Sequence, residues 1–214
     1  MEFLNEALQK YVEDHTQEES PLLKQINRQT HAEVMRPRML SGHLQGRVLA
    51  MLSHMIQPQT ILEIGTYTGY SAICLAEGLA AGGKLITIDK NDELEERVRA
   101  YFEAANLEEN ITYLLGNAME LIPTLDMSFD LVFIDADKAN YTHYYDMVID
   151  KVRTGGYIIA DNVLWSGKVV PEGRTKLDKD TQVMLDFNAK VHMDARVQNV
   201  LLPIRDGLMI LRKL

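Results

Sequence analysis

Apolar residues follow a helical rhythm through the first 56 residues of the chain. Near the N-terminus they recur every three or four positions, at Phe3, Leu4, Ala7, Leu8, Tyr11 and Val12. This spacing places them on one face of a helix. A second helix is expected from Ser20, with Pro21 in its first turn, and a third over 42–56, where Pro58 ends it. Residues 1–56 are therefore predicted to be a helical segment.

From Thr60 the pattern changes to short apolar runs separated by helical segments. The runs are ILEIG, KLITID, ITYLLG, FDLVFID and YIIAD, with helices expected near Gly69, Asp92, Ala118 and Ala139. Strands that alternate with helices are typical of a parallel sheet with crossover helices. The nearly continuous apolar character of the runs indicates strands that are buried on both faces.

The order changes again after Asp161. A polar stretch over 166–179 leads into a helical pattern, and ARVQNVLLP and GLMILRKL then follow without a helix between them. A turn at Arg205-Asp206-Gly207 would join them as an antiparallel hairpin. We predict an α/β fold, a doubly wound, mostly parallel seven-stranded sheet that ends in this hairpin. At 214 residues the chain is expected to form one domain, with helices over 1–56 and the α/β core over 57–214.

Composition excludes several classes of protein. The single cysteine, Cys74, cannot form an intramolecular disulfide or a cysteine zinc site, and a reducing cytoplasm is expected. The N-terminus mixes charged with apolar residues, so neither a signal peptide nor a membrane span is expected. The net charge of −9 disfavours a nucleic-acid partner, although it does not exclude a local basic patch.

The first strand ends in the segment LEIGTYTGYS, which is a candidate cofactor loop. Gly65 would let backbone approach a ligand, and the carboxyl ends of parallel strands line the ligand crevice of such sheets. A plain tight turn is the alternative. Asp89 follows Gly65 at a spacing that also fits a nicotinamide dinucleotide. The segment lacks G-x-G-x-x-G, and Glu63 would repel a phosphate, so S-adenosylmethionine is favoured.

Acidic residues end the fourth and fifth predicted strands. FIDADK carries Asp135, Asp137 and Lys138, and IIADN carries Asp161 and Asn162. Both segments finish at the same edge of a parallel sheet, and carboxylate and amide oxygens are the ligands that Mg²⁺, Ca²⁺ or Mn²⁺ prefer. The alternative is that these aspartates cap the helices or turns that follow, and that Lys138 is a solvated lysine at a helix start.

These motifs together resemble the cation-dependent class I O-methyltransferases, typified by caffeoyl-CoA and catechol O-methyltransferases. LEIGTYTGYS, FIDADKANYTHYY, GGYIIADNVLWSGKV and LLPIRDGL match that family's pattern in order, over roughly residues 35–214. The resemblance implies a Rossmann-like methyltransferase fold, S-adenosylmethionine as cofactor and a divalent cation beside it. It also implies a homodimer and small aromatic substrates that carry adjacent hydroxyls.

The resemblance also assigns roles to single residues. It implies cofactor contacts at Ser41, Glu63, Gly65, Thr66, Ser71, Asp89, Ala118, Asp135 and Asp137. Asp135, Asp161 and Asn162 match metal ligands, and Lys138 matches the general base, so that Lys138 and Asp135 are the catalytic pair. Trp165 matches a position near the substrate, although a buried core tryptophan is an equal alternative. Arg205 departs from the pattern, which usually has a small residue there.

The favoured hypothesis is methyl transfer to a substrate hydroxyl that chelates the cation, with Lys138 as proton acceptor. Three rivals stay open at this point. One is methylation of a hydroxylated uridine in tRNA, which the acidic total disfavours. Another is an NAD-dependent oxidoreductase, and the last is a non-catalytic protein on the same fold.

Overall fold

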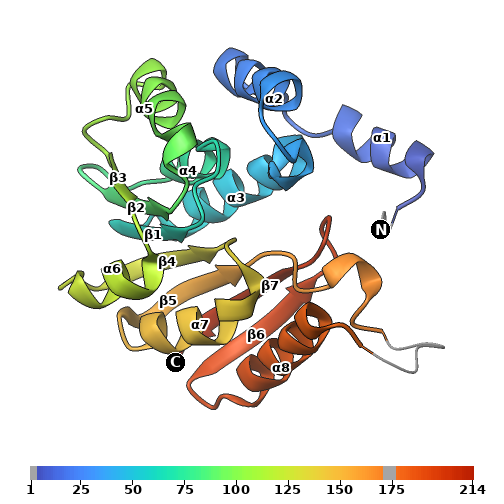
Figure 1. Cartoon of the computed structure of the whole chain (residues 1–214), viewed down its shortest axis with the longest axis vertical. Coiled ribbons are helices and arrows are strands. Elements are labelled where there is room, and N and C mark those ends of the chain that lie inside the picture. The colour runs from blue at the N-terminus through green and yellow to red at the C-terminus, as the bar shows by residue number, and fades with distance from the viewer. Residues whose placement is uncertain (1–3, 171–176) are drawn as a thin grey trace. The chain divides into compact units, whose positions relative to one another are not determined.

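The computed structural model describes residues 4–170 and 177–214, which divide into two compact units, Leu4–Ala118 and Met119–Leu214 (Figure 1). We call them the N-terminal and C-terminal units and treat each by itself. Phe3, which the first helical stripe includes, lies outside the described residues, as do 171–176 of the polar stretch. The single-domain organisation stays a prediction.

Helices precede the first strand of the N-terminal unit, and helices and strands then alternate. Its elements are α1 (Glu6–Asp14), α2 (Pro21–Glu33), the 3₁₀ turn η1 (Pro37–Met39), α3 (Gly42–Ile56), β1 (Thr60–Ile64), α4 (Tyr70–Ala76), β2 (Lys84–Asp89), η2 (Asp92–Leu94), α5 (Glu95–Ala104) and β3 (Ile111–Leu115).

Local signals place the first helices where the sequence predicted them. Asn5 and Ser20 cap α1 and α2 through side-chain oxygens that accept the amides of Leu8 and Leu23, at 2.9 and 3.2 Å. Helix α3 ends at Gln57, whose φ of +50° turns the chain away before Pro58. The helical prediction for this segment is confirmed.

In the N-terminal unit β2 pairs in parallel with both β1 and β3. The register aligns Glu63 with Thr87 and Thr87 with Tyr113. Because aligned residues of parallel strands face the same side of a sheet, these three side chains form one row across it. All three are buried, so the row is a polar strip within an otherwise apolar core.

The C-terminal unit contains the remaining strands. Its elements are α6 (Ala118–Thr124, which begins at the last residue of the N-terminal unit), β4 (Phe129–Ile134), η3 (Lys138–Asn140), α7 (Tyr141–Ile149), β5 (Val152–Ala160), η4 (Trp165–Gly167), α8 (Lys179–Met193), β6 (Val197–Leu202) and β7 (Leu208–Lys213).

In this unit β4 and β5 are parallel, whereas β7 pairs antiparallel with both β5 and β6. Helices α7 and α8 pack against one another through Phe187, whose ring meets Tyr141 and Tyr145 edge to face at centroid distances of 5.4 and 6.4 Å. The apolar faces of these helices explain why they cover the sheet, as Figure 1 shows for α7 and α8.

The predicted fold class is confirmed, with seven strands, mostly parallel pairing, intervening helices and a C-terminal antiparallel hairpin. The helices expected near Asp92 and Ala139 each begin with a short 3₁₀ turn. Among the described residues, no helix is both long and apolar enough to span a membrane.

Candidate active site

The loop after β1 has an unusual backbone that tight hydrogen bonds hold in place. Gly65 and Gly69 have φ of +101° and +78°, and Tyr67 between them has +49°. Glycine adopts these values freely, whereas a tyrosine requires support from its surroundings. Within the loop the amide of Gly69 donates to the carbonyl of Thr66 at 2.8 Å. We call residues 65–69 the glycine loop.

Asp89, at the end of β2, supplies that support. One carboxylate oxygen accepts the amides of Thr66 and Tyr67 at 3.0 and 2.7 Å, and the other accepts the amide of Asn91 at 2.9 Å. Hydrogen bonds to an ionised carboxylate are stronger than neutral ones. Asp89 therefore holds the backbone of the glycine loop and also lies at the predicted spacing from Gly65. A plain tight turn requires neither feature.

Below the loop lies a buried polar chain. The Thr87 hydroxyl donates to Glu63 at 2.5 Å and shares a hydrogen bond of 2.5 Å with the Thr66 hydroxyl. Glu63 is fully buried at the end of β1. Burying a carboxylate costs free energy unless hydrogen bonds stabilise it. The hydrogen bond from Thr87 therefore helps to keep Glu63 in the core.

The other predicted cofactor residues of this unit are also buried. Ser71 lies in the first turn of α4, Ser41 precedes α3, and Ala118 begins α6.

Two contacts that the sequence did not reveal fix the outer side of the glycine loop. The Tyr67 hydroxyl donates to the carbonyls of Met35 and Arg36 at 3.1 and 3.3 Å. The Thr30 hydroxyl donates to the Thr68 hydroxyl at 3.3 Å. The helical segment before β1 thereby holds the loop. No local motif indicated these partners, because they lie more than 30 residues away in the chain.

In the C-terminal unit, three functional groups meet at the end of β4. The Lys138 ammonium lies 3.3 Å from an Asp135 oxygen and donates to the Tyr141 hydroxyl at 2.6 Å. It also lies over the ring of Tyr141, 4.4 Å from the centroid. The side chains of Lys138 and Asp135 are only 11% and 20% exposed, so Lys138 is not the solvated lysine of the alternative interpretation.

Tyr141 joins this group to the end of β5. Its hydroxyl donates to the backbone carbonyl of Asp161 at 3.0 Å, and the Asp161 amide donates to the carbonyl of Ile134 at 3.0 Å. Burial first, and then the charges of Asp135 and Asp161, raise the pKa of Tyr141 well above its ordinary value. Tyr141 therefore stays protonated. No pattern in the sequence singled out Tyr141.

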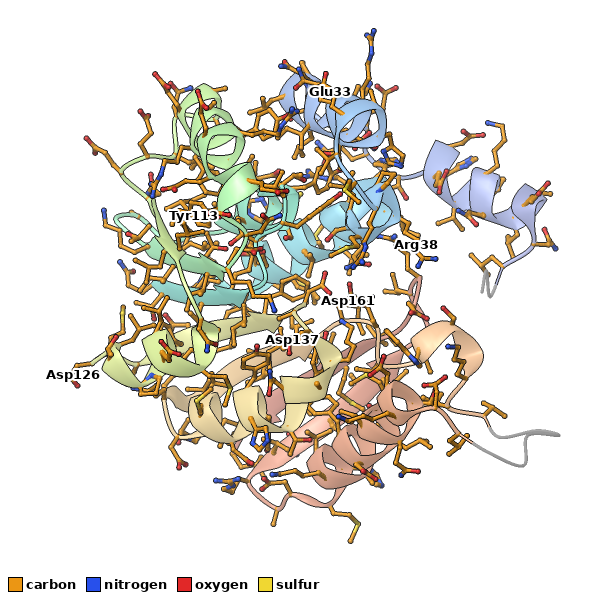
Figure 2. The ribbon with its side chains drawn as sticks, viewed as in Figure 1. Glu33, Arg38, Tyr113, Asp126, Asp137 and Asp161 are labelled. Atoms are coloured by element: carbon orange, nitrogen blue, oxygen red, sulfur yellow. The ribbon has the colours of Figure 1, made fainter. Side chains whose placement is uncertain are left out.

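The aspartates at the two strand ends make different contacts. Asp161 is 3% exposed, and its carboxylate accepts the amide of Asn162, the next residue, at 2.6 Å. Asp137 makes no side-chain bond to the backbone of the turn that follows; its carboxylate accepts the Tyr144 hydroxyl and the Asn140 amide group, both at 2.6 Å. Figure 2 labels Asp137 after β4 and Asp161 after β5.

Trp165 lies in the loop that follows Asn162. Its indole nitrogen is buried and finds no hydrogen-bond partner among the described residues. Lys168 lies over the ring, 5.8 Å from the centroid. In an apolar core, a buried N–H without a hydrogen-bond partner would lower the stability of the fold. A bound ligand could instead accept a hydrogen bond from this nitrogen.

Each unit can thus carry part of a group transfer. The N-terminal unit offers a rigid loop with buried acid and hydroxyl groups but no G-x-G-x-x-G run. The C-terminal unit offers a lysine beside the Asp135 carboxylate, and oxygen atoms of Asp135, Asp161 and Asn162 that could bind a hard cation.

Comparisons with known proteins agree with this chemistry. Residues 13–214 match the family described as O-methyltransferase. The chain is 36% identical to caffeoyl-CoA O-methyltransferase 2 of Eucalyptus globulus over 179 residues, covering 79% of this chain and 72% of that protein. It is 33% identical to tricin synthase 1 of Oryza sativa subsp. japonica over 189 residues, covering 82% and 75%.

Solved structures are similar along almost the whole chain. A methyltransferase of Podospora anserina with S-adenosylhomocysteine bound has a TM-score of 0.90 at 26% identity, covering 100% of this chain and 98% of that one. The O-methyltransferase of Bacillus cereus, in complex with the same product, has a TM-score of 0.87 at 29% identity, with 97% of both chains covered. The chain therefore belongs to the O-methyltransferase family of S-adenosylmethionine-dependent enzymes.

Proposed function

We propose that the protein methylates one hydroxyl of a small aromatic compound that carries adjacent hydroxyls, with the help of a divalent cation. The observation that carries this proposal is the group formed by Lys138, Asp135 and Tyr141 beside Asp161. It offers a proton acceptor next to hard oxygen ligands, which is what deprotonation of a chelating hydroxyl requires. The names of the relatives, caffeoyl-CoA O-methyltransferase and tricin synthase, point to phenolic acceptors.

We assign the methyl donor to the strand ends and loops that the sequence singled out. Glu63, Gly65, Thr66 and Ser71 would hold the methionine portion, and Asp89 the ribose hydroxyls. Ser41, Ala118, Asp135 and Asp137 would make the remaining cofactor contacts. The buried, hydrogen-bonded state of Glu63 and Thr66 suits an amino-acid portion without phosphates. Asp89 would serve twice, because it also holds the amides of the glycine loop.

The residues at the ends of β4 and β5 fit a hard cation. Asp135 and Asp161 are carboxylates, Asn162 adds an amide oxygen, and Mg²⁺, Mn²⁺ and Ca²⁺ prefer such ligands. In this proposal the amide oxygen of Asn162 would serve as the third protein ligand beside the two carboxylates. A bound cation would lower the pKa of a coordinated hydroxyl.

The side chains of the C-terminal unit would then handle the proton. The acceptor oxygen would form its bond to the methyl carbon as the carbon–sulfur bond broke, which would leave S-adenosylhomocysteine. The hydroxyl proton would go to the Lys138 nitrogen, which must first be in its neutral amine form. Tyr141 holds the Lys138 nitrogen at 2.6 Å and is itself anchored on the Asp161 backbone. The indole N–H of Trp165, buried and without a partner among the described residues, would donate to an oxygen of the acceptor only after the surrounding loop moves.

The test is methyl transfer from labelled S-adenosylmethionine in the presence of Mg²⁺. We expect turnover of catechols, caffeoyl-type esters or flavonoids that have adjacent hydroxyls, little with the matching monohydroxy compounds, and loss of turnover with EDTA. Equal rates on the monohydroxy compounds, or normal rates with EDTA, would contradict the proposed chelation. Bulk tRNA in the same assay tests the alternative acceptor, a hydroxylated uridine.

We further propose a cytoplasmic homodimer that uses Mg²⁺. Helix α1 is amphipathic but buries none of its residues, and its apolar side chains Leu8 and Tyr11 are 46% and 59% exposed. Met51 and Met55 of α3 are exposed as well. Apolar exposure of this kind is typical of a face that a partner covers. Light scattering after gel filtration should give twice the mass of 24.3 kDa.

A further inference from the structure

The loop after β5 carries more backbone strain than any other short segment among the described residues. Asn162, Trp165 and Ser166 have φ of +60°, +47° and +54°. None is glycine, and each such residue costs about 1 kcal/mol or more. Conformations of this kind persist only where the surrounding structure determines them. We call residues 162–167 the acceptor loop, because it follows Asp161 and carries both Asn162 and Trp165.

The turn between β6 and β7 holds the acceptor loop in place. The Leu164 amide donates to the Asp206 carbonyl at 2.8 Å, and the Val163 amide to the Gly207 carbonyl at 3.2 Å. The Ser166 amide donates to the Asp206 carboxylate. Asp206 thus binds the loop twice, once through its backbone and once through its charge, on either side of Trp165.

Close packing reinforces these hydrogen bonds. Gly207 has φ of +90°, and a Cβ atom there would lie 2.5 Å from Cγ of Leu164 and 3.0 Å from its nitrogen. The turn therefore lies directly against the backbone of the loop. Its sequence, Asp206-Gly207, supplies the two things that the loop needs, a charged acceptor and a residue without a side chain.

We infer that Asp206 is a positioning residue for methyl transfer. It fixes the acceptor loop, and through the loop it sets the positions of Asn162 and Trp165. This inference rests on the proposed function, in which Asn162 binds the cation and Trp165 contacts the acceptor. In this role Asp206 itself contacts neither the cation nor the acceptor. Removing its carboxylate should loosen the loop while the core and the glycine loop of the N-terminal unit remain intact.

Trp165 provides a readout that does not depend on activity, since it is the single tryptophan of the chain. In Asp206→Ala we expect its fluorescence to shift to longer wavelength and to be quenched more strongly by acrylamide. Asp206→Asn keeps an oxygen acceptor for the Ser166 amide and should restore most of the wild-type signal. Unchanged emission and quenching in a folded Asp206→Ala would overturn the inference.

Asp194 offers a matched control in the same unit. Its carboxylate accepts the Arg196 amide at 2.9 Å and the Tyr145 hydroxyl at 2.8 Å, in the connection between α8 and β6. Asp194→Ala should lower the melting temperature at least as much as Asp206→Ala, because it removes more hydrogen bonds. It should leave the Trp165 signal unchanged. An equal change of fluorescence in both variants would reduce Asp206 to a general stabilising residue.

Kinetics and calorimetry complete the test. In Asp206→Ala we expect the acceptor KM to rise and Mg²⁺ affinity to fall by about tenfold, since one charge-assisted hydrogen bond is lost. Affinity for S-adenosylhomocysteine should not change. If the wild-type protein binds no cation, the proposed function fails, and the fluorescence comparison still decides the role of Asp206. If the wild type binds the cation and Asp206→Ala keeps the wild-type KM for the acceptor, the positioning role of Asp206 is contradicted while the proposed function stands.

Discussion

The glycine loop after β1 and the acceptor loop after β5 solve the same structural problem differently. Each leaves the end of a parallel strand and bends through positive φ values, and an aspartate accepts its amides in each case. The glycine loop is bent mainly at Gly65 and Gly69, and its aspartate stands on the neighbouring strand. The acceptor loop is bent at three non-glycine residues, and its aspartate comes 40 residues later, in a hairpin turn.

This difference indicates how the two loops respond to change. The glycine loop has a backbone that costs little at Gly65 and Gly69, so its geometry should survive most substitutions except those at its glycines and at Asp89. The acceptor loop stores strain and relies on the hairpin, so its geometry should be easier to shift. A cofactor loop with a low-cost backbone and an acceptor loop held by a distant turn would let acceptor choice change without loss of the methyl donor.

The largest expected effect comes from the Asp161 carboxylate, directly before the acceptor loop. Asp161→Ala should lower cation-dependent turnover by about 100-fold or more, because it removes a proposed metal ligand. Calorimetry should show S-adenosylhomocysteine binding unchanged. Asp126→Ala, which removes an exposed aspartate of the same unit, serves as the control. Turnover near the wild-type value would remove Asp161 from the site.

Breaking the glycine loop should have the next largest effect. Asp89→Ala removes the acceptor of three backbone amides. We expect affinity for S-adenosylhomocysteine to fall by about 10- to 100-fold, the equivalent of one or two hydrogen bonds to a charged group.

Asp92→Ala, three residues later and exposed, should bind the product normally. If both variants bind it equally well, Asp89 neither holds the loop nor contacts the cofactor.

A smaller effect is expected at Tyr141. Tyr141→Phe removes the hydroxyl that accepts from Lys138 and donates to Asp161, while the ring stays packed on Phe187. Turnover should fall by about five- to tenfold, the equivalent of roughly 1 kcal/mol for one hydrogen bond. The acceptor KM and the affinity for the product should stay near the wild-type values.

Tyr144→Phe on the same helix removes a hydroxyl bonded to Asp137 and is the matched comparison. A larger loss there than in Tyr141→Phe would contradict the assigned role of Tyr141.

The smallest expected effect comes from backbone strain in the turn between β6 and β7. Arg205 has φ of +50°, a value that glycine adopts more freely than arginine. Arg205→Gly should raise the free energy of unfolding by up to about 1 kcal/mol, measured by urea denaturation.

Tyr67 has nearly the same φ, +49°, and its hydroxyl binds the carbonyls of Met35 and Arg36, which Tyr67→Gly would remove. Tyr67→Gly should therefore give no gain in stability. A gain in both variants would mean that the hydroxyl contacts of Tyr67 contribute nothing.

Periodicity and motifs predicted most of what is local in this protein. Helix α3 spans the predicted 42–56, and the five parallel strands and the hairpin lie where apolar runs indicated them. The strand-end aspartates and Lys138 followed from their positions after buried strands. What the sequence could not reveal were partners from distant segments, such as Tyr141 with the Asp161 backbone, or Tyr67 with Met35.

The sequence by itself determined the fold class, the strand ends and the kinds of side chain that stand at them, because strand and helix periods and turn residues act over a few positions. Only the tertiary structure decided which of these side chains bind one another. Asp89 with the glycine loop and Asp206 with the acceptor loop are contacts between segments that no local pattern relates. Such contacts form only after strands pair and helices pack, so their geometry belongs to the folded chain and not to any single motif.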